Sequence, residues 1–226
     1  MMNTKHTLRA VLALMLMLSL FLTGCASDSV APHDEAPALS DEGVATQAAA
    51  MALVTAHVLP RMVEYSSTNK DMYSYEFSDE DVVAGTIWLD FRTGGADGAP
   101  ATYSAGDWCR MHTADGEAIG FAVGLDSQIA VTLNIMADIV QATDTATVRA
   151  GSGGTFTAGA YSATFDFADV VVTAGQNYPA GGTMTFVSGA RVLTVTFDGD
   201  ETAVATLAGG GSWVLNLEDG SINAAG

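Results

Sequence analysis

The sequence predicts a mainly β fold, in which one N-terminal helix packs on a large antiparallel meander sheet. From Val82 onward, apolar and polar residues alternate over short β-branched runs, and this is the period of a half-buried strand. Turn residues, mostly Gly and Asp, separate these runs roughly every 8 to 12 residues. An alanine-rich stretch upstream has helical spacing instead. We expect so large a sheet to curl into a partial barrel or to split into a two-layer sandwich.

The expected strands are short, and consecutive strands should form antiparallel hairpins. They lie at 72–77, 82–91, 118–123, 128–136, 146–149, 155–157, 161–167, 170–173, 183–187, 192–197, 202–207 and 212–217. Two glycine clusters, 151–154 and 209–211, fall between runs and are expected to be hairpin turns. No helix-length pattern separates the runs, so parallel βαβ units are excluded.

The expected helix covers residues 44–65, where alanine dominates and apolar residues recur at spacings of three and four. Ser40 and Asp41 precede it and offer capping side chains. Pro60 should kink or split this helix, because proline lacks the N–H and crowds the preceding turn.

The first 24 residues have the pattern of an export signal. Lys5, His6 and Arg9 give a positive start, and residues 10–22 are apolar except for Ser19. As a helix this run would be about 20 Å long, too short for a membrane core of about 30 Å. It has the length of the apolar region of a secretory signal.

The residues Leu22-Thr23-Gly24-Cys25 resemble the lipobox of bacterial lipoproteins. The resemblance implies cleavage between Gly24 and Cys25 and attachment of acyl chains, such as palmitate, to Cys25. It makes the membrane the partner, bound through that lipid. Ala26 follows the cysteine in place of the Asp that favours inner-membrane retention in this family. The implied location is therefore the outer membrane, on its periplasmic face or at the cell surface.

Downstream of the signal we expect two regions. Residues 25–43 are acidic, polar and proline-bearing, and should form a flexible tether. Residues 44–226 should form a single β-rich domain that begins with the helix.

Charge limits the partners of the mature chain. The sequence has 26 acidic and 8 basic residues, a net charge of −18, and removing residues 1–24 takes away two basic residues and no acidic ones. Nucleic acid is excluded, because its binding depends on cationic side chains that displace counterions from phosphate.

The cysteines and histidines give no metal site or other cofactor site. With Cys25 lipidated, Cys109 has no internal disulfide partner. It is either a buried small residue, or a reactive thiol or the site of an intermolecular disulfide. His112 follows nearby, but neither a third ligand nor an orienting acid stands at motif spacing.

No familiar catalytic motif occurs, and we expect no enzyme activity. His57, Arg61 and Glu64 share a helix face and form either an exposed ion pair or a His–Glu unit. Asp79 with Asp81, and Asp198 with Asp200, are either ordinary turn residues or acidic pairs that bind a cation or act as a catalytic carboxylate pair. The tryptophans favour core packing over a ligand groove; they are Trp88, Trp108 and Trp213.

Three functions therefore compete. The first is a non-catalytic envelope lipoprotein with a structural, adhesive or partner-binding role. The second is a carrier of a small apolar ligand, held in a cavity between the helix and a curved sheet. The third and weakest is a hydrolase that uses paired acids, which requires carboxylates converging in a cleft. An unfilled concave face would favour the carrier, and a packed interior would count against it.

Overall fold

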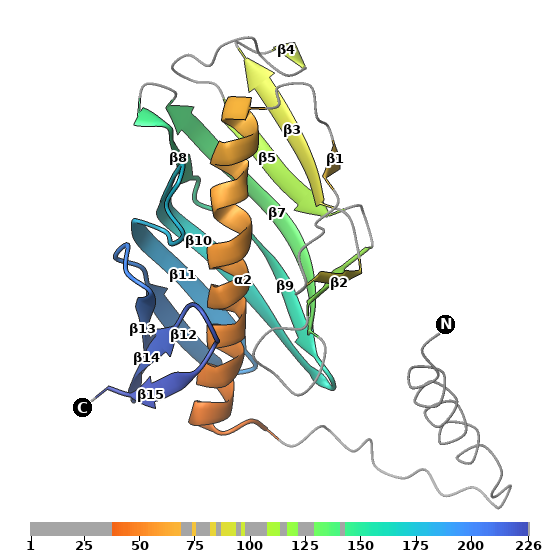
Figure 1. Ribbon diagram of the computed structural model, residues 1–226. Helices are drawn as coiled ribbons and strands as arrows, with labels where there is room; N and C mark the ends of the chain where they lie inside the picture. Colours follow the sequence, from red (N-terminus) through yellow and green to blue (C-terminus); the bar gives the residue numbers. More distant parts are fainter. Residues whose placement is uncertain are drawn as a thin grey trace, which may run out of the picture. The chain divides into compact units, whose positions relative to one another are not determined.

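The computed structural model describes residues 38–68, 74–75, 82–84, 87–93, 96–97, 108–113, 117–121, 129–140 and 143–225. The expected signal and lipid attachment site lie outside these residues, as does the expected tether up to residue 37. In the described part, one long helix, α2, lies against the concave face of a curved sheet (Figure 1).

Helix α2 (Asp41–Thr68) is longer than expected at both ends. Ser40 caps it: the Gly43 N–H donates to Ser40 Oγ at 3.0 Å, and the Val44 N–H donates to Ser40 O at 3.0 Å. Asp41 and Glu42 occupy the first turn, where the helix dipole favours negative charge. The helix therefore begins three residues before the expected boundary, inside the segment assigned to the tether. Pro60 does not split it, because the α-helix continues to Thr68.

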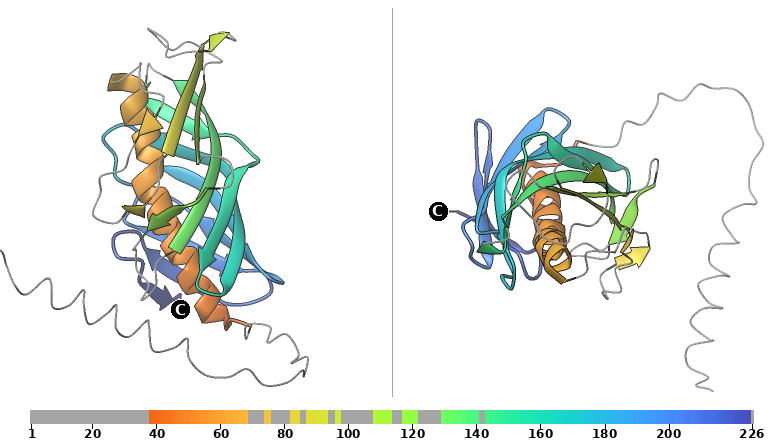
Figure 2. Two further views of the ribbon diagram at one scale, coloured as in Figure 1. Left: turned by 90° about the vertical axis from the view of Figure 1, so that its right-hand side faces the viewer. Right: turned by 90° about the horizontal axis from the view of Figure 1, so that it is seen from above.

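The strands form one antiparallel sheet, as expected, in the order β1-β3-β5-β7-β8-β10-β11-β12-β13-β14-β15. The described strands are β1 (Ser74–Tyr75), β2 (Val82–Ala84), β3 (Ile87–Thr93), β4 (Ala96–Asp97), β5 (Trp108–Thr113), β6 (Ile119–Phe121), β7 (Ile129–Val140), β8 (Thr145–Val148), β9 (Ser152–Ala158), β10 (Tyr161–Thr173), β11 (Gly181–Ser188), β12 (Arg191–Thr196), β13 (Thr202–Leu207), β14 (Ser212–Asn216) and β15 (Ile222–Ala224). Because these strands belong to one sheet, the structure is the curled partial barrel and not the two-layer alternative (Figure 2).

The meander from β10 to β15 confirms the alternating pattern. Each strand pairs with the next in sequence. On β12, Leu193 and Val195 are buried, whereas Thr194 and Thr196 are exposed on the other face. The expected strands 161–167 and 170–173 are one strand, β10, in which Asp169 has a φ of 54° and the register shifts. The local irregularity thus bends the strand without ending it.

Strand β7 has 12 residues, and on each of its two sides it pairs with two successive shorter strands in place of one long strand. On one side it pairs with β8 and then β9, and on the other with β5 and then β6. Strands β8 and β9 therefore follow one another along β7 and do not pair with each other. Within glycine cluster 151–154, Gly151 precedes β9 and Ser152–Gly154 are the first residues of β9. The hairpin expected there is wrong, whereas cluster 209–211 does turn the chain from β13 to β14.

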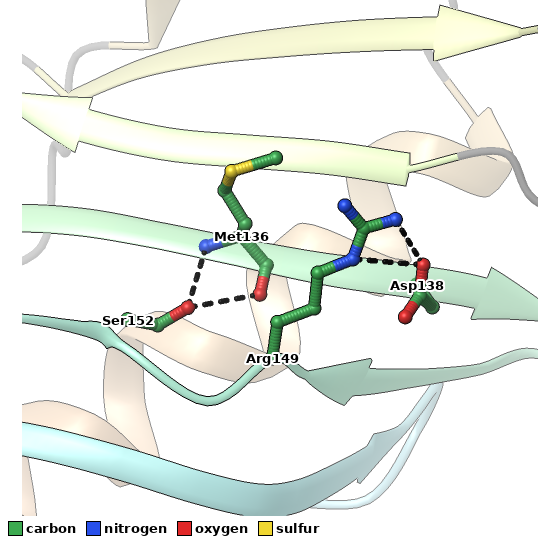
Figure 3. Close-up of polar contacts among 4 residues, drawn as sticks. All are labelled: Met136, Asp138, Arg149 and Ser152. Atoms are coloured by element: carbon green, nitrogen blue, oxygen red, sulfur yellow. Dashed lines mark hydrogen bonds and ion pairs between the residues drawn. The ribbon is translucent and has the colours of Figure 1, made fainter.

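Buried hydroxyls replace main-chain partners at the two breaks between these successive strands. Ser152 Oγ accepts from the Met136 N–H at 3.0 Å in place of a main-chain acceptor (Figure 3). It also donates at 3.1 Å to Met136 O, which accepts from the Arg149 N–H at 2.8 Å as well. On the opposite side of β7, Thr113 Oγ1 accepts from the Leu133 N–H at 3.3 Å. A buried backbone group without a partner costs free energy, so these side chains let β7 run past both breaks.

Two further features lie close to Ser152: an ion pair between β7 and the residue that follows β8, and a close approach of β9 to β7. Arg149 Nε donates to Asp138 Oδ1 at 2.9 Å, and this hydrogen bond raises the pKa of the arginine (Figure 3). Two residues after Ser152, a Cβ on Gly154 would lie 1.9 Å from the carbonyl oxygen of Thr132. Glycine is therefore required at 154 for the close approach of β9 to β7.

The core lies between α2 and the concave face of the sheet, which surrounds the helix as a partial ring when seen from above (Figure 2). Phe156 on β9 and Phe186 on β11 are fully buried there, with ring centroids 5.5 Å apart at 75°. Residues 47–56 of the helix are all buried, over more than two turns, so every face of this part is covered. Six buried alanines in the helix permit this close approach; they are Ala45, Ala48, Ala49, Ala50, Ala52 and Ala56.

The segment Asp41–Val63 of α2 is also long and apolar enough to cross a membrane, judged by length and composition. In the fold, 78% of the window that passes this test is buried. Burial against the sheet accounts for its apolar composition.

Candidate functional site

A pocket of about 530 Å³ lies where the C-terminal half of α2 meets two connections of the sheet. Ligand sites in proteins typically measure about 300–1,000 Å³. The lining consists of Ala56, His57, Pro60 and Arg61 from α2, residues 175–178 from the β10–β11 connection and residues 217–218 after β14. Six of these ten residues have polar side chains, but apolar atoms make up slightly more than half of the lining surface, so the pocket is mixed in character whereas the core beneath the helix is largely apolar.

On the helix side, the pocket opens beside Pro60. Proline cannot donate a hydrogen bond to the carbonyl four residues earlier, which is that of Ala56, another lining residue. His57 and Arg61 stand one turn apart on the same face. His57 is exposed and Arg61 is half-buried.

On the sheet side, the β10–β11 connection is fixed by main-chain hydrogen bonds. The Ala174 N–H donates to Asp144 O at 2.8 Å, and the Ala180 N–H donates to Val171 O at 2.7 Å. Gly175 has a φ of 75°, which favours glycine. Tyr178, at the end of the lining segment, packs against the core. Hydrogen bonds and packing therefore fix both ends of the connection, and Gln176 and Asn177 lie between these ends.

The Tyr178 hydroxyl donates to Glu218 Oε1 at 2.9 Å and links the two connections. Glu218 is itself positioned by Asn216, whose Oδ1 accepts from the Glu218 N–H at 2.7 Å. Burial raises the pKa of the Tyr178 phenol, and the hydrogen bond to Glu218 and the charges of Glu218 and Glu201 raise it further. The phenol is thus kept in its neutral, donating form.

A second, shallower hollow of about 390 Å³ shares Tyr178 with the pocket. Asp200 and Glu201 line it, and the Leu217 N–H donates to Glu201 O at 2.8 Å. Acidic side chains therefore stand on both sides of the tyrosine.

Two residues singled out from the sequence, His57 and Arg61, lie at this pocket. The side chain of Glu64 is outside the described part of the structure, so the His–Glu unit stays a prediction. The sequence reasoning missed residues 175–178 and 217–218, which follow the helix by more than a hundred positions. Only Pro60 and the spacing of His57 and Arg61 pointed to this end of the helix.

The other candidate residues are dispersed. Cys109 is fully buried on the inner face of β5, as one of its two interpretations expected. His112 is on the opposite face of β5, where its Nδ1 is 2.9 Å from Thr113 O. The strand geometry therefore keeps Cys109 and His112 apart.

The tryptophans do not share a groove. Trp213 is 9% exposed and packs in the core, as expected. Trp88 is 38% exposed on the outer face of β3, so core packing was the wrong interpretation for this residue. Nothing is described for the side chain of Trp108.

The acidic pair Asp198 and Asp200 builds a turn, because Asp198 Oδ1 accepts from the Asp200 N–H at 3.2 Å. Asp79 and Asp81 lie outside the described residues. Within the described part of the chain, no group of three or more His, Cys, Asp or Glu residues could hold a metal ion.

Neither the protein-family models, the curated proteins nor the solved structures include a match to this chain.

Proposed function

We propose that this protein is a lipid-anchored, non-catalytic binding module of the bacterial outer membrane, and that the pocket beside Pro60 is its ligand site. The observation that carries the binding role is the contrast between a filled interior and a pocket of ligand size whose lining combines polar and apolar groups. The anchor rests on the lipobox resemblance of Leu22-Thr23-Gly24-Cys25. The outer-membrane location rests on Ala26.

The filled interior weighs against the carrier of an apolar ligand. Residues 47–56 of α2 are buried against the concave face, which is where such a carrier would hold its cargo. Binding there would require the helix to leave the sheet and expose its apolar surface, at a cost of about 25 cal/mol per Å².

The lining chemistry favours recognition of a polar ligand. Glu218, Tyr178, Asn177, Gln176 and Arg61 all line the pocket. Together they supply charged groups, amide donors and acceptors, and an aromatic ring. Directional polar groups of this kind fix the orientation of a bound small ligand.

The anchor is tested by the intact mass of the full chain purified from bacterial membranes. We expect two or three acyl chains on the wild-type protein, and their loss in Cys25→Ala together with a move to the soluble fraction. Cys109→Ala is the matched control and should keep both the lipid and the membrane location. An unlipidated wild-type protein with unchanged fractionation in Cys25→Ala would contradict the anchor.

The binding site is tested by amide chemical shifts of the full chain in detergent micelles during titration with small polar compounds. We expect ligands to shift residues 175–178 and 217–218. An apolar compound that instead shifts residues 47–56 of α2 would contradict the proposed site and support the carrier.

A further inference from the structure

The pocket brings together side chains of opposite charge from separate elements. Arg61 comes from α2, and Glu218 comes from the turn after β14. Beyond Tyr178, Asp200 and Glu201 extend the acidic side. A singly charged ligand would be complementary to only one of these groups, whereas a ligand with both charges would be complementary to both.

The acidic side is built to accept hydrogen bonds from a cation. Glu218 is oriented by its main-chain bond to Asn216 and by the Tyr178 hydroxyl, which occupies Oε1. A carboxylate has about four acceptor sites, so acceptor capacity remains for an ammonium group.

The cationic side suits a carboxylate. Arg61 carries five N–H donors in a planar fork, so it can bind an anionic ligand while it keeps its other contacts. The protein has a net charge of −18, and its overall field attracts cations and repels anions. Arg61 offsets part of this repulsion for a carboxylate in the pocket.

We propose that the pocket binds a small zwitterion that carries an ammonium and a carboxylate group, such as an amino acid or a short peptide with unblocked ends. The proposal rests on the proposed function, which makes this pocket the ligand site. The pocket volume of about 530 Å³ accommodates molecules of this size. Gln176 and Asn177 supply the donors and acceptors that a peptide group requires.

The test compares three forms of one dipeptide with the full chain in detergent micelles, by amide chemical shifts. The probes are Ala-Ala, N-acetyl-Ala-Ala, which lacks the ammonium group, and Ala-Ala-amide, which lacks the carboxylate. Ala-Ala should shift residues 175–178 at millimolar concentration, the weak end of specific binding. Each blocked form should bind about tenfold more weakly, the effect of losing one charge-assisted hydrogen bond.

Variants assign each charge to its residue. In Glu218→Gln, N-acetyl-Ala-Ala should bind no more weakly than Ala-Ala. In Arg61→Gln, Ala-Ala-amide should bind no more weakly than Ala-Ala. Arg149→Gln, outside the pocket, is the control and should leave all three affinities unchanged. If Arg61→Gln fails to fold, the Glu218→Gln comparison decides by itself.

The outcomes separate this inference from the function on which it rests. Equal binding of the three peptides, or binding of only a neutral sugar such as maltose at residues 175–178, would overturn the zwitterion and leave the ligand site standing. If neither the peptides nor the sugar shift the pocket, and an apolar compound shifts residues 47–56, both proposals are overturned.

Discussion

The two parts of α2 have the same helical backbone but differ in how completely they are covered. Residues 47–56 are buried on all sides by the core, whereas in the next turn Val58 and Leu59 stay buried while His57, Pro60 and Arg61 line the pocket. Small side chains bring the first part close to the sheet, and Pro60 with two polar neighbours marks the second. In this fold, the helix fills the concave face of the sheet, and the pocket forms where one side of the helix is no longer covered.

The buried part is not wholly apolar, and its two polar side chains behave differently. Thr55 Oγ1 donates to Met51 O at 2.8 Å, so its hydroxyl is satisfied. Gln47 is 5% exposed, and among the described residues its Oε1 has no hydrogen-bond partner. A buried unsatisfied acceptor costs about 1–3 kcal/mol, so Gln47 is a weak point in the packing.

The largest effect should come from removing a ring beneath the helix. Phe186→Ala deletes a fully buried side chain that meets Phe156 edge to face. We expect a loss of about 3–5 kcal/mol in the free energy of unfolding, measured by urea denaturation. Phe186→Leu should cost clearly less. A loss below about 1 kcal/mol would mean that the interior is not close-packed.

A smaller loss of stability should distinguish the fully buried part of the helix from the part that lines the pocket. Ala49→Leu adds volume where the helix is fully buried and should cost about 1–3 kcal/mol. His57→Leu, at the exposed edge of the pocket, should change stability by no more than about 0.5 kcal/mol. Equal effects in thermal unfolding would contradict the contrast between the two parts.

Gln47→Met should stabilise the protein by about 1 kcal/mol, because it keeps the length of the side chain and removes the unsatisfied oxygen. Gln47→Glu should destabilise it, since it buries a charge in the same place. Both changes are measured by urea denaturation. A destabilising Gln47→Met would indicate that the amide has a role that the described contacts do not include.

The pocket should show the smallest effect, in the alkaline titration of Tyr178. Its pKa is raised above the ordinary value of 10.0, so its contribution to stability is complete below that value and is lost as the pH rises through the folded-state pKa. Glu218→Gln should lower the pKa of Tyr178, because the acceptor loses its charge. The measurement is phenolate absorbance, with Tyr178→Phe subtracted to isolate one of six tyrosines. An unchanged titration in Glu218→Gln would contradict the coupling of these two residues.

The sequence predicted best the parts of the fold that depend on local pattern. Strands β11 to β14 alternate regularly between turns, and their pairing follows chain order. Strand β5 was missed, because the charged Arg110 and the polar His112 stand on its outer face and the strand is only six residues long. Strand β15 was missed because only three residues form it.

The breaks along β7 and the pocket depend on contacts distant in sequence. The cluster 151–154 has turn composition, but both flanking strands pair with the same partners, β7 and β10. Nothing local to Ser152 indicates that its hydroxyl replaces a main-chain partner of Met136. Likewise, the hydrogen bond between Tyr178 and Glu218 joins residues 40 positions apart, so no local sequence motif could predict it.

Hydrogen exchange of the full chain tests the filled interior most directly, by comparing residues 47–56 of α2 with strands β11 and β12. Amides that exchange only through global unfolding share one free energy of opening, once each observed rate is divided by the intrinsic rate of that amide. We predict that these helix amides exchange as slowly as those of the two strands, and that an added apolar compound leaves their rate unchanged. Helix amides that exchange orders of magnitude faster than the strands would show that α2 leaves the sheet, and the account of a filled interior would be wrong.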